Sequence, residues 1–163
     1  MSYLFKKAKF QILSLFPLFF LFYISLTGNS IINFNLFSIN ILYIMVYFFT
    51  LRNPENLGYG FIFLAGITTD VVIGFPFGVH ALSLLIIAGV AAYVRALTVR
   101  ITLLNDWISF IPALLLANFI YFLSLYFLSY EVDYFYLLKN SISTFIFYPV
   151  LWGVFSLILN LYR

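Results

Sequence analysis

The stretch GYGFIFLAGITTDVVIGFPFGVHALSLLIIAGVAAYVRAL, residues 58–97, decides the fold of this chain. Before Arg95, its ionisable side chains are Asp70, His80 and two tyrosines. A run this apolar is typical of membrane-spanning helices, and a charged group in hydrocarbon costs about 2.5–3.5 kcal/mol on insertion scales. We therefore expect Asp70 to have a packed or functional role.

The composition of the whole chain indicates a polytopic membrane protein. Its 163 residues are 65% hydrophobic and 8% charged, with a mean hydropathy of +1.12, whereas soluble domains carry about 25% charged residues. So few polar residues leave no room for a soluble catalytic domain. We expect an all-α fold with one transmembrane domain over residues 1–163.

Charge and cysteine content exclude several classes of function. The net charge of +3 provides no basic face for nucleic acid. The absence of cysteine excludes disulfides, thiolate zinc sites and cysteine nucleophiles. One histidine and five scattered carboxylates make a metal cluster improbable. We therefore expect no metal, no cofactor and no nucleic-acid partner.

Breaks in hydropathy divide the chain into about six spans, since a spanning helix needs about 20 mostly apolar residues. Clusters of turn formers occupy 27–30, 52–56 and 74–78, and polar segments occupy 100–106 and 131–133. We expect the first span to stay uncleaved, because no small-residue cleavage site follows it. The predicted spans are 10–27, 32–51, 57–74, 78–95, 104–129 and 142–161.

The basic residues predict the orientation of this bundle. Six spans place both termini on one side, and seven of the eight Lys and Arg residues then share that side, with Lys139 opposite. By the positive-inside rule, both termini are cytoplasmic and the loops at Gly28, Pro76 and 131–140 are outside. We expect the small-residue spans 57–74 and 78–95 to form the bundle centre, and Asn118 to make an interhelical hydrogen bond.

Asp70 lies on a stripe of small residues. Gly66, Asp70 and Gly74 are four apart, so they share one face of a helix that a neighbouring backbone can approach. The turn Gly74–Gly78 then returns His80 to a similar depth, where it can meet Asp70. We favour a structural lock between the two helices, in which Asp70 accepts hydrogen bonds from His80 or from turn amides.

Two other roles for this pair stay open. A carboxylate that orients a histidine base is an arrangement of hydrolases, but Thr68, Thr69 and Ser83 show no nucleophile spacing signature. We therefore predict no catalytic residues. Binding of a ligand or of a partner's transmembrane helix is the remaining possibility.

The run GITTDVVIGFPFGVHAL, residues 66–82, resembles the signature of MreD, the bacterial rod shape-determining membrane protein family. The G-x-x-x-D-x-x-x-G-x-x-x-G pattern followed by A-L is matched by Gly66, Asp70, Gly74, Gly78, Ala81 and Leu82, and the small-residue helix ends at Arg95. Chain length and hydropathy also fit this family. The motif similarity covers about residues 54–95, and the aromatic-rich flanks diverge. With Pro76 and His80, these residues are the candidate motif.

The resemblance implies a non-enzymatic component of the elongation machinery in the bacterial cytoplasmic membrane. Its implied partners are the bitopic protein MreC, the actin-like MreB filament, and the peptidoglycan polymerase and transpeptidase of the lateral wall. The implied fold is similar to that of the substrate-binding subunits of energy-coupling factor vitamin transporters. Such a subunit is the alternative function, although the short outer loops leave only residues 131–140 as a lid.

Overall fold

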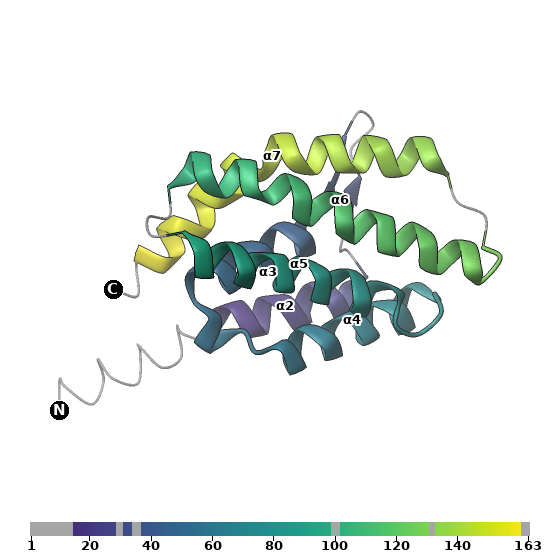
Figure 1. Ribbon diagram of the computed structural model, residues 1–163. Coiled ribbons are helices and arrows are strands. Elements are labelled where there is room, and N and C mark those ends of the chain that lie inside the picture. The colour runs from purple at the N-terminus through teal and green to yellow at the C-terminus, as the bar shows by residue number, and fades with distance from the viewer. Residues whose placement is uncertain (1–14, 29–30, 34–36, 99–101, 131–132, 161–163) are drawn as a thin grey trace, which may run out of the picture.

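Six helices and one β-hairpin make up the part of the chain that this computed structural model describes, residues 15–28, 31–33, 37–98, 102–130 and 133–160 (Figure 1). The all-α expectation is confirmed at this level. A short 3-10 turn, Pro54–Asn56, joins the second helix to the third. The helices are α2 (Phe16–Thr27), α3 (Ile41–Arg52), α4 (Tyr59–Ile73), α5 (Val79–Leu97), α6 (Leu103–Phe127) and α7 (Tyr134–Asn160).

Local sequence sets several of these boundaries. Asn40 caps α3 because its side-chain oxygen accepts a hydrogen bond from the Tyr43 amide at 3.1 Å. Thr102 caps α6 through the Asn105 amide at 3.4 Å. Gly74 ends α4 in the left-handed conformation, with φ of 80°, a geometry that glycine adopts without steric cost. The predicted spans 57–74, 78–95 and 104–129 therefore correspond closely to α4, α5 and α6.

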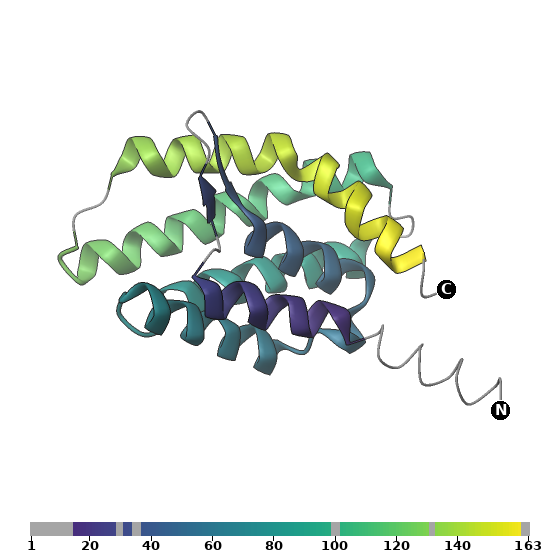
Figure 2. The same ribbon diagram turned by 180° about the vertical axis from the view of Figure 1, so that it is seen from behind.

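The centre of the bundle is α3, with α5 beside it. Every residue of α3 from Leu42 to Leu51 is buried, and α5 packs against α3, α4 and α6. By contrast, α4 lies at the edge, where it packs on α2 and α5 and exposes residues such as Phe61 and Leu64 (Figures 1 and 2). The expectation that 57–74 belongs to the centre is therefore wrong. Lipid-facing and core positions are equally apolar, so composition does not separate them.

The predicted span 32–51 is also corrected, because α3 begins only at Ile41, nearly halfway along that span. A short antiparallel hairpin pairs β1 (Ile31–Asn33) with β2 (Ser38–Asn40), and α3 begins only after it. The residues of β2 are buried, and the Asn40 amide donates to Thr144 Oγ1 of α7 at 2.9 Å. This extended segment is supported by α7, since its backbone groups find partners inside the protein.

Helix α7 is longer than expected. It begins at Tyr134 rather than at 142, so most of the predicted loop 131–140 is helical. Asp133 starts it by accepting hydrogen bonds from the amides of Phe135 and Tyr136, both at 3.0 Å. Polar residues predicted a loop here, but Asp133 caps a helix, and Lys139 and Asn140 lie within it.

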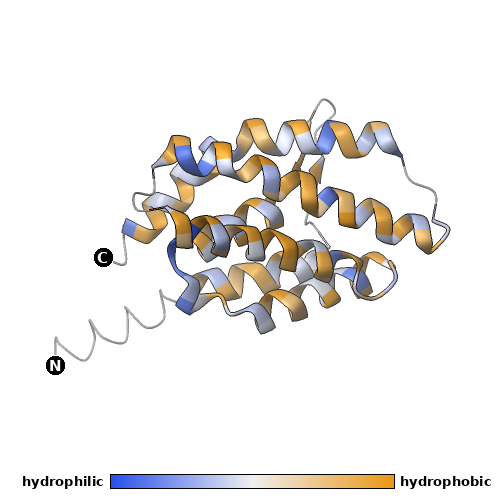
Figure 3. Cartoon of the chain, viewed as in Figure 1, coloured by the Kyte–Doolittle hydropathy of each residue, from blue (hydrophilic) through white to orange (hydrophobic). Residues whose placement is uncertain are grey.

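Three helices, α5, α6 and α7, are long and apolar enough to cross a membrane. The helices α2, α3 and α4 are apolar but shorter. Figure 3 shows apolar residues over the length of the helices and hydrophilic ones mainly near their ends. Much of the apolar surface is exposed, for example Phe119 and Leu115 on α6 and Ile146 and Leu157 on α7. Such surfaces are typical of contact with lipid or with other helices.

Candidate functional site: the Asp70 cluster and the turn-end cavity

Asp70 is fully buried and accepts three hydrogen bonds from the start of α5. One carboxylate oxygen accepts from the Gly78 amide at 2.8 Å. The other accepts from the His80 amide at 3.0 Å and pairs with His80 Nδ1 at 2.7 Å. The expected contact between Asp70 and His80 is therefore present, as is the expected contact with a turn amide. We call Asp70, Gly78 and His80 the Asp70 cluster.

The backbone of the same hairpin adds two further bonds. The Asp70 carbonyl accepts from the amides of Gly74 at 3.0 Å and Phe75 at 2.9 Å. One residue thus satisfies amide groups on both sides of the α4–α5 turn, at the place where helix ends leave backbone groups unpaired. The cluster fixes the direction in which α5 leaves the turn.

The glycines of the motif have different roles. At Gly66, an added Cβ would lie 2.6 Å from the backbone nitrogen of Ala81, so α4 and α5 touch through their backbones there. Gly74 and Gly78 have open space around an added Cβ but φ values of 80° and 102°. The close approach predicted for the stripe Gly66, Asp70 and Gly74 is therefore present at Gly66, which meets Ala81, whereas Gly74 and Gly78 supply backbone conformation.

The remaining candidate motif residues are Pro76, Leu82 and Arg95, and none of them belongs to the Asp70 cluster. Pro76 lies within the turn and is half-buried. Leu82 is 49% exposed and faces away from the bundle. Arg95 is exposed at the far end of α5, roughly 22 Å from His80 along the helix axis. There Arg95 lines a separate cavity with Tyr59 and Thr50.

The hydroxyl groups near the Asp70–His80 pair are committed to their own helices. Thr68 and Thr69 both donate to the Ala65 carbonyl, at 2.8 and 2.9 Å, and Ser83 donates to the Val79 carbonyl at 2.9 Å. Among the described residues, none of these hydroxyls is hydrogen-bonded to His80. This arrangement holds a histidine in place but does not present an activated nucleophile to it.

A cavity of about 390 Å³ lies beside the Asp70 cluster, at the end of the bundle that carries the α4–α5 turn. We call it the turn-end cavity. Each helix from α3 to α7 contributes at least one lining residue. The lining also includes Asp133, just before α7, and Tyr136. Its other polar lining residues are Asn40, Tyr43, His80, Asn118, Tyr121 and Asn140.

Three aromatic rings form one wall of this cavity. The His80 ring lies 5.3 Å from the Tyr121 ring and 5.7 Å from the Phe75 ring, centroid to centroid. Phe75 and Tyr121 are 6.5 Å apart in an edge-to-face arrangement. These separations are those of favourable aromatic contacts. The wall joins the turn, α5 and α6.

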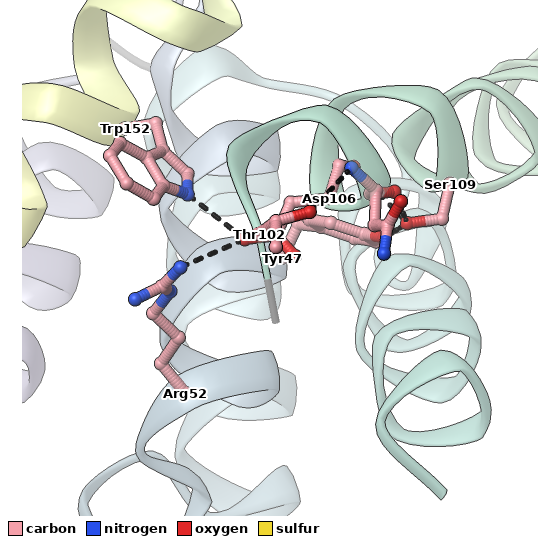
Figure 4. A network of polar contacts seen from close by, with 7 residues as sticks. Tyr47, Arg52, Thr102, Asp106, Ser109 and Trp152 are labelled. Atoms are coloured by element: carbon pink, nitrogen blue, oxygen red, sulfur yellow. Dashed lines mark hydrogen bonds and ion pairs between the residues drawn. The ribbon is translucent and has the colours of Figure 1, made fainter. Parts of the chain in front are cut away.

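The opposite end of the bundle holds a second buried carboxylate, Asp106, that the sequence reasoning did not select. One of its oxygens accepts from Trp152 Nε1 at 2.9 Å and from Arg52 at 3.2 Å (Figure 4). The Arg52 guanidinium also lies 4.7 Å from the Trp152 ring centroid. Nearby, the Tyr47 hydroxyl and Ser109 Oγ are 2.8 Å apart. This network ties α3, α6 and α7 together.

The expected interhelical bond of Asn118 is present, with Nδ2 donating to Ser141 Oγ on α7 at 2.7 Å. Among the described residues, no three His, Asp or Glu side chains lie close enough together to hold a metal ion. Comparison with protein-family models, with curated proteins and with solved structures finds no match for this chain. The resemblance to MreD therefore stands on the residues 66–82 that carry its motif.

Proposed function

We propose that this chain is a non-enzymatic, multi-pass component of the bacterial elongation machinery, an MreD-like protein that scaffolds partner membrane proteins for lateral peptidoglycan synthesis. The observation that carries the proposal is the α4–α5 hairpin. The motif residues Gly66, Asp70, Gly78 and Ala81 all make close contacts within it. A motif that fixes two helices against each other suits a scaffold, because it defines the shape of a docking surface and provides no catalytic group.

The exposed surface of the helices supports this proposal. In a bilayer, helices associate by close packing rather than by a hydrophobic driving force. Apolar residues of α4, including Phe63 and Val71, are exposed. The outer faces of α4, α6 and α7 are thus surfaces on which a partner helix, such as that of an MreC-like protein, can pack. In this proposal, MreB and the polymerase–transpeptidase complex join through the same assembly.

The proposal includes six membrane crossings in the cytoplasmic membrane, with both termini inside. Successive helices run in alternating directions (Figures 1 and 2). The twelve residues of α3 extend about 18 Å, and the three residues of β2 add about 10 Å. Their combined length approaches the thickness of the hydrocarbon core, which is about 30 Å. Non-helical backbone is tolerated at that depth when it is buried in protein, as β2 is.

Depletion of the chain in its own host tests the scaffold proposal. We expect rods to become round, and the native chain supplied in trans to restore rods and to co-purify with the MreC-like protein. Gly66→Leu forces α4 away from α5, so it should lose both effects, whereas Gly60→Leu on the same helix meets open space and should keep them. Normal rods after complete depletion would contradict the proposal. A reporter after Arg163 should be cytoplasmic, and a periplasmic signal would overturn the six-span topology.

The turn-end cavity favours a second candidate function, the ligand-binding subunit of an energy-coupling factor type transporter. Its polar lining from several helices is the feature expected of such a subunit. Co-purification with a transporter ATPase instead of an MreC-like protein would favour this function over the scaffold.

A further inference from the structure

The turn-end cavity has a chemical character of its own, which goes beyond the scaffold proposal. Three of its polar side chains, those of His80, Asn118 and Asn140, direct a hydrogen-bond donor to a partner in the protein. An ionised carboxylate only accepts hydrogen bonds, so with Asp70 in that form the 2.7 Å contact to His80 Nδ1 places a ring proton on Nδ1. Among the described residues, Nε2 of His80 has no hydrogen-bond partner. In the neutral ring, Nε2 is therefore an acceptor available to the cavity.

The side-chain amide of Asn118 likewise directs its NH₂ group to a partner in the protein, Ser141. Ser141 Oγ donates its own proton to the Leu137 carbonyl at 2.7 Å. It can therefore only accept at its 2.7 Å contact with Asn118, which must place Nδ2 there. The side-chain oxygen of Asn118, a lining residue, is left as the acceptor.

The amide of Asn140 follows the same logic. Ser38 Oγ donates to the Tyr136 hydroxyl at 3.4 Å and accepts from Asn140 Nδ2 at 2.8 Å. The NH₂ group of Asn140 is thus hydrogen-bonded to Ser38 of β2, and the side-chain oxygen of Asn140 is left as an acceptor. Asp133 adds a carboxylate at the rim, and the described lining residues include no Lys or Arg. The neutral His80 ring and the two amides therefore present three acceptors to the cavity, beside the hydroxyls of Tyr43 and Tyr121, which both donate and accept.

We propose that the turn-end cavity binds a small, flat, positively charged molecule that carries N–H donors, such as an aromatic amidine or an amino-substituted heterocycle. The aromatic wall of Phe75, His80 and Tyr121 offers ring faces, which attract flat cations. The volume of about 390 Å³ lies in the range of small-molecule sites. A phospholipid head group fits poorly, because its phosphate would meet acceptors and the Asp133 carboxylate.

The test uses the purified full chain in zwitterionic nanodiscs with two fluorescent probes, 2-naphthamidine and 2-naphthoate. They have the same shape but opposite charge, and only the amidine donates hydrogen bonds. We expect saturable binding of the amidine that is at least tenfold tighter than that of the carboxylate. Absence of saturable amidine binding, or equal binding of the two probes, overturns the proposal.

Variants locate the binding. Tyr121→Leu removes one ring of the aromatic wall, and Leu137→Trp fills the cavity from α7. Each is expected to weaken amidine binding at least tenfold. Tyr126→Leu, at a 65% exposed position on α6, is the matched control and should bind as the native chain does. Unchanged binding in both cavity variants places the probe elsewhere and overturns the proposal.

A third probe, an N-acetylated arginine amide, addresses a peptide occupant. If it binds more tightly than naphthamidine, the site takes a partner's arginine side chain, which overturns the flat-ring assignment. These measurements need no partner protein or cell-shape readout. Their failure therefore leaves the scaffold proposal standing, and failure of the depletion test leaves the cavity assignment standing.

Discussion

Replacing Asp70 with asparagine tests how much the α4–α5 turn depends on one carboxylate. Asparagine has the same shape but a single acceptor oxygen. In its better orientation, that oxygen keeps the bonds from the His80 amide and from Nδ1, and the new NH₂ group faces the Gly78 amide that Asp70 now satisfies at 2.8 Å. One bond is lost, one amide is left without a partner, and the two remaining bonds lose their charge.

The expected cost follows from these changes. A buried donor without a partner costs about 1–3 kcal/mol, and hydrogen bonds to a charged group are about twice as strong as neutral ones. We expect Asp70→Asn to lower the free energy of unfolding by about 3 kcal/mol. For a chain of this size that corresponds to a fall in the melting temperature of roughly 6–12 °C. Asp70→Ala, which leaves all three donors without a partner, should cost more.

The assay is thermal unfolding of the purified chain in detergent, followed by intrinsic fluorescence. The matched control is Asp133→Asn at the same end of the bundle, where the exposed side chain caps α7. Asparagine caps a helix about as well as aspartate, so this variant should melt within about 2 °C of the native chain. Equal melting temperatures for Asp70→Asn and Asp133→Asn would refute the assignment of Asp70 as the main tie of the turn.

Three further predictions use the same unfolding assay. Gly66→Ala places a methyl group 2.6 Å from a backbone nitrogen of α5 and should lower the free energy of unfolding by about 1–3 kcal/mol. Its control, Gly60→Ala, meets open space and should be neutral or stabilising. Equal effects of the two substitutions would contradict the close contact. Trp152→Phe removes one of the two partners of Asp106 and should cost about 1.5–3 kcal/mol; an unchanged melting temperature would show that the bond contributes nothing. Gly74→Asn should be tolerated better than Gly74→Val, because φ is 80° there; the reverse order would exclude a conformational role for this glycine.

Local sequence was enough to predict the Asp70 cluster. Asp70 and His80 are ten residues apart and joined by a tight turn, so the hairpin brings them together once both helices form. The turn formers Gly74 and Gly78 marked the helix ends directly, and the structure gives both positive φ values. Spacing did not reveal that these two glycines are needed for their backbone conformation, whereas Gly66 is the motif glycine that allows the two helices to touch.

The Asp106 network could not be predicted in the same way. Its partners Arg52 and Trp152 are 54 and 46 residues away, so the contact depends on how α3, α6 and α7 pack. In the sequence, Asp106 marked only a break in hydropathy and Arg52 only a cytoplasmic charge. The available signal was that Arg52 and Asp106 fall at the ends of two predicted spans on one side. Trp152 falls in the middle of the predicted span 142–161, so the spans did not indicate that it meets the other two.

The position of α3 was missed for a related reason. In a soluble protein, a helix that is apolar on all sides is a core helix, but in a membrane protein lipid-facing helices have the same composition. Small residues pointed to α4, whereas the fully buried helix is α3, with large side chains such as Tyr47 and Phe48. Glycine and alanine mark where two helices approach closely, which happens as readily at the edge of a bundle as at its centre.

The polar contacts of this bundle also explain how it can keep a cavity. Apolar side chains between helices pack to the density of a crystal and leave few voids, so an open cavity needs walls that are held apart by other means. Each of three lining residues is held by a polar partner outside the cavity: His80 by Asp70, Asn118 by Ser141, and Asn140 by Ser38. Loosening any of these pairs frees a lining side chain to turn inward. Substitutions at Asp70 should therefore change the occupancy of the cavity as well as the stability of the turn.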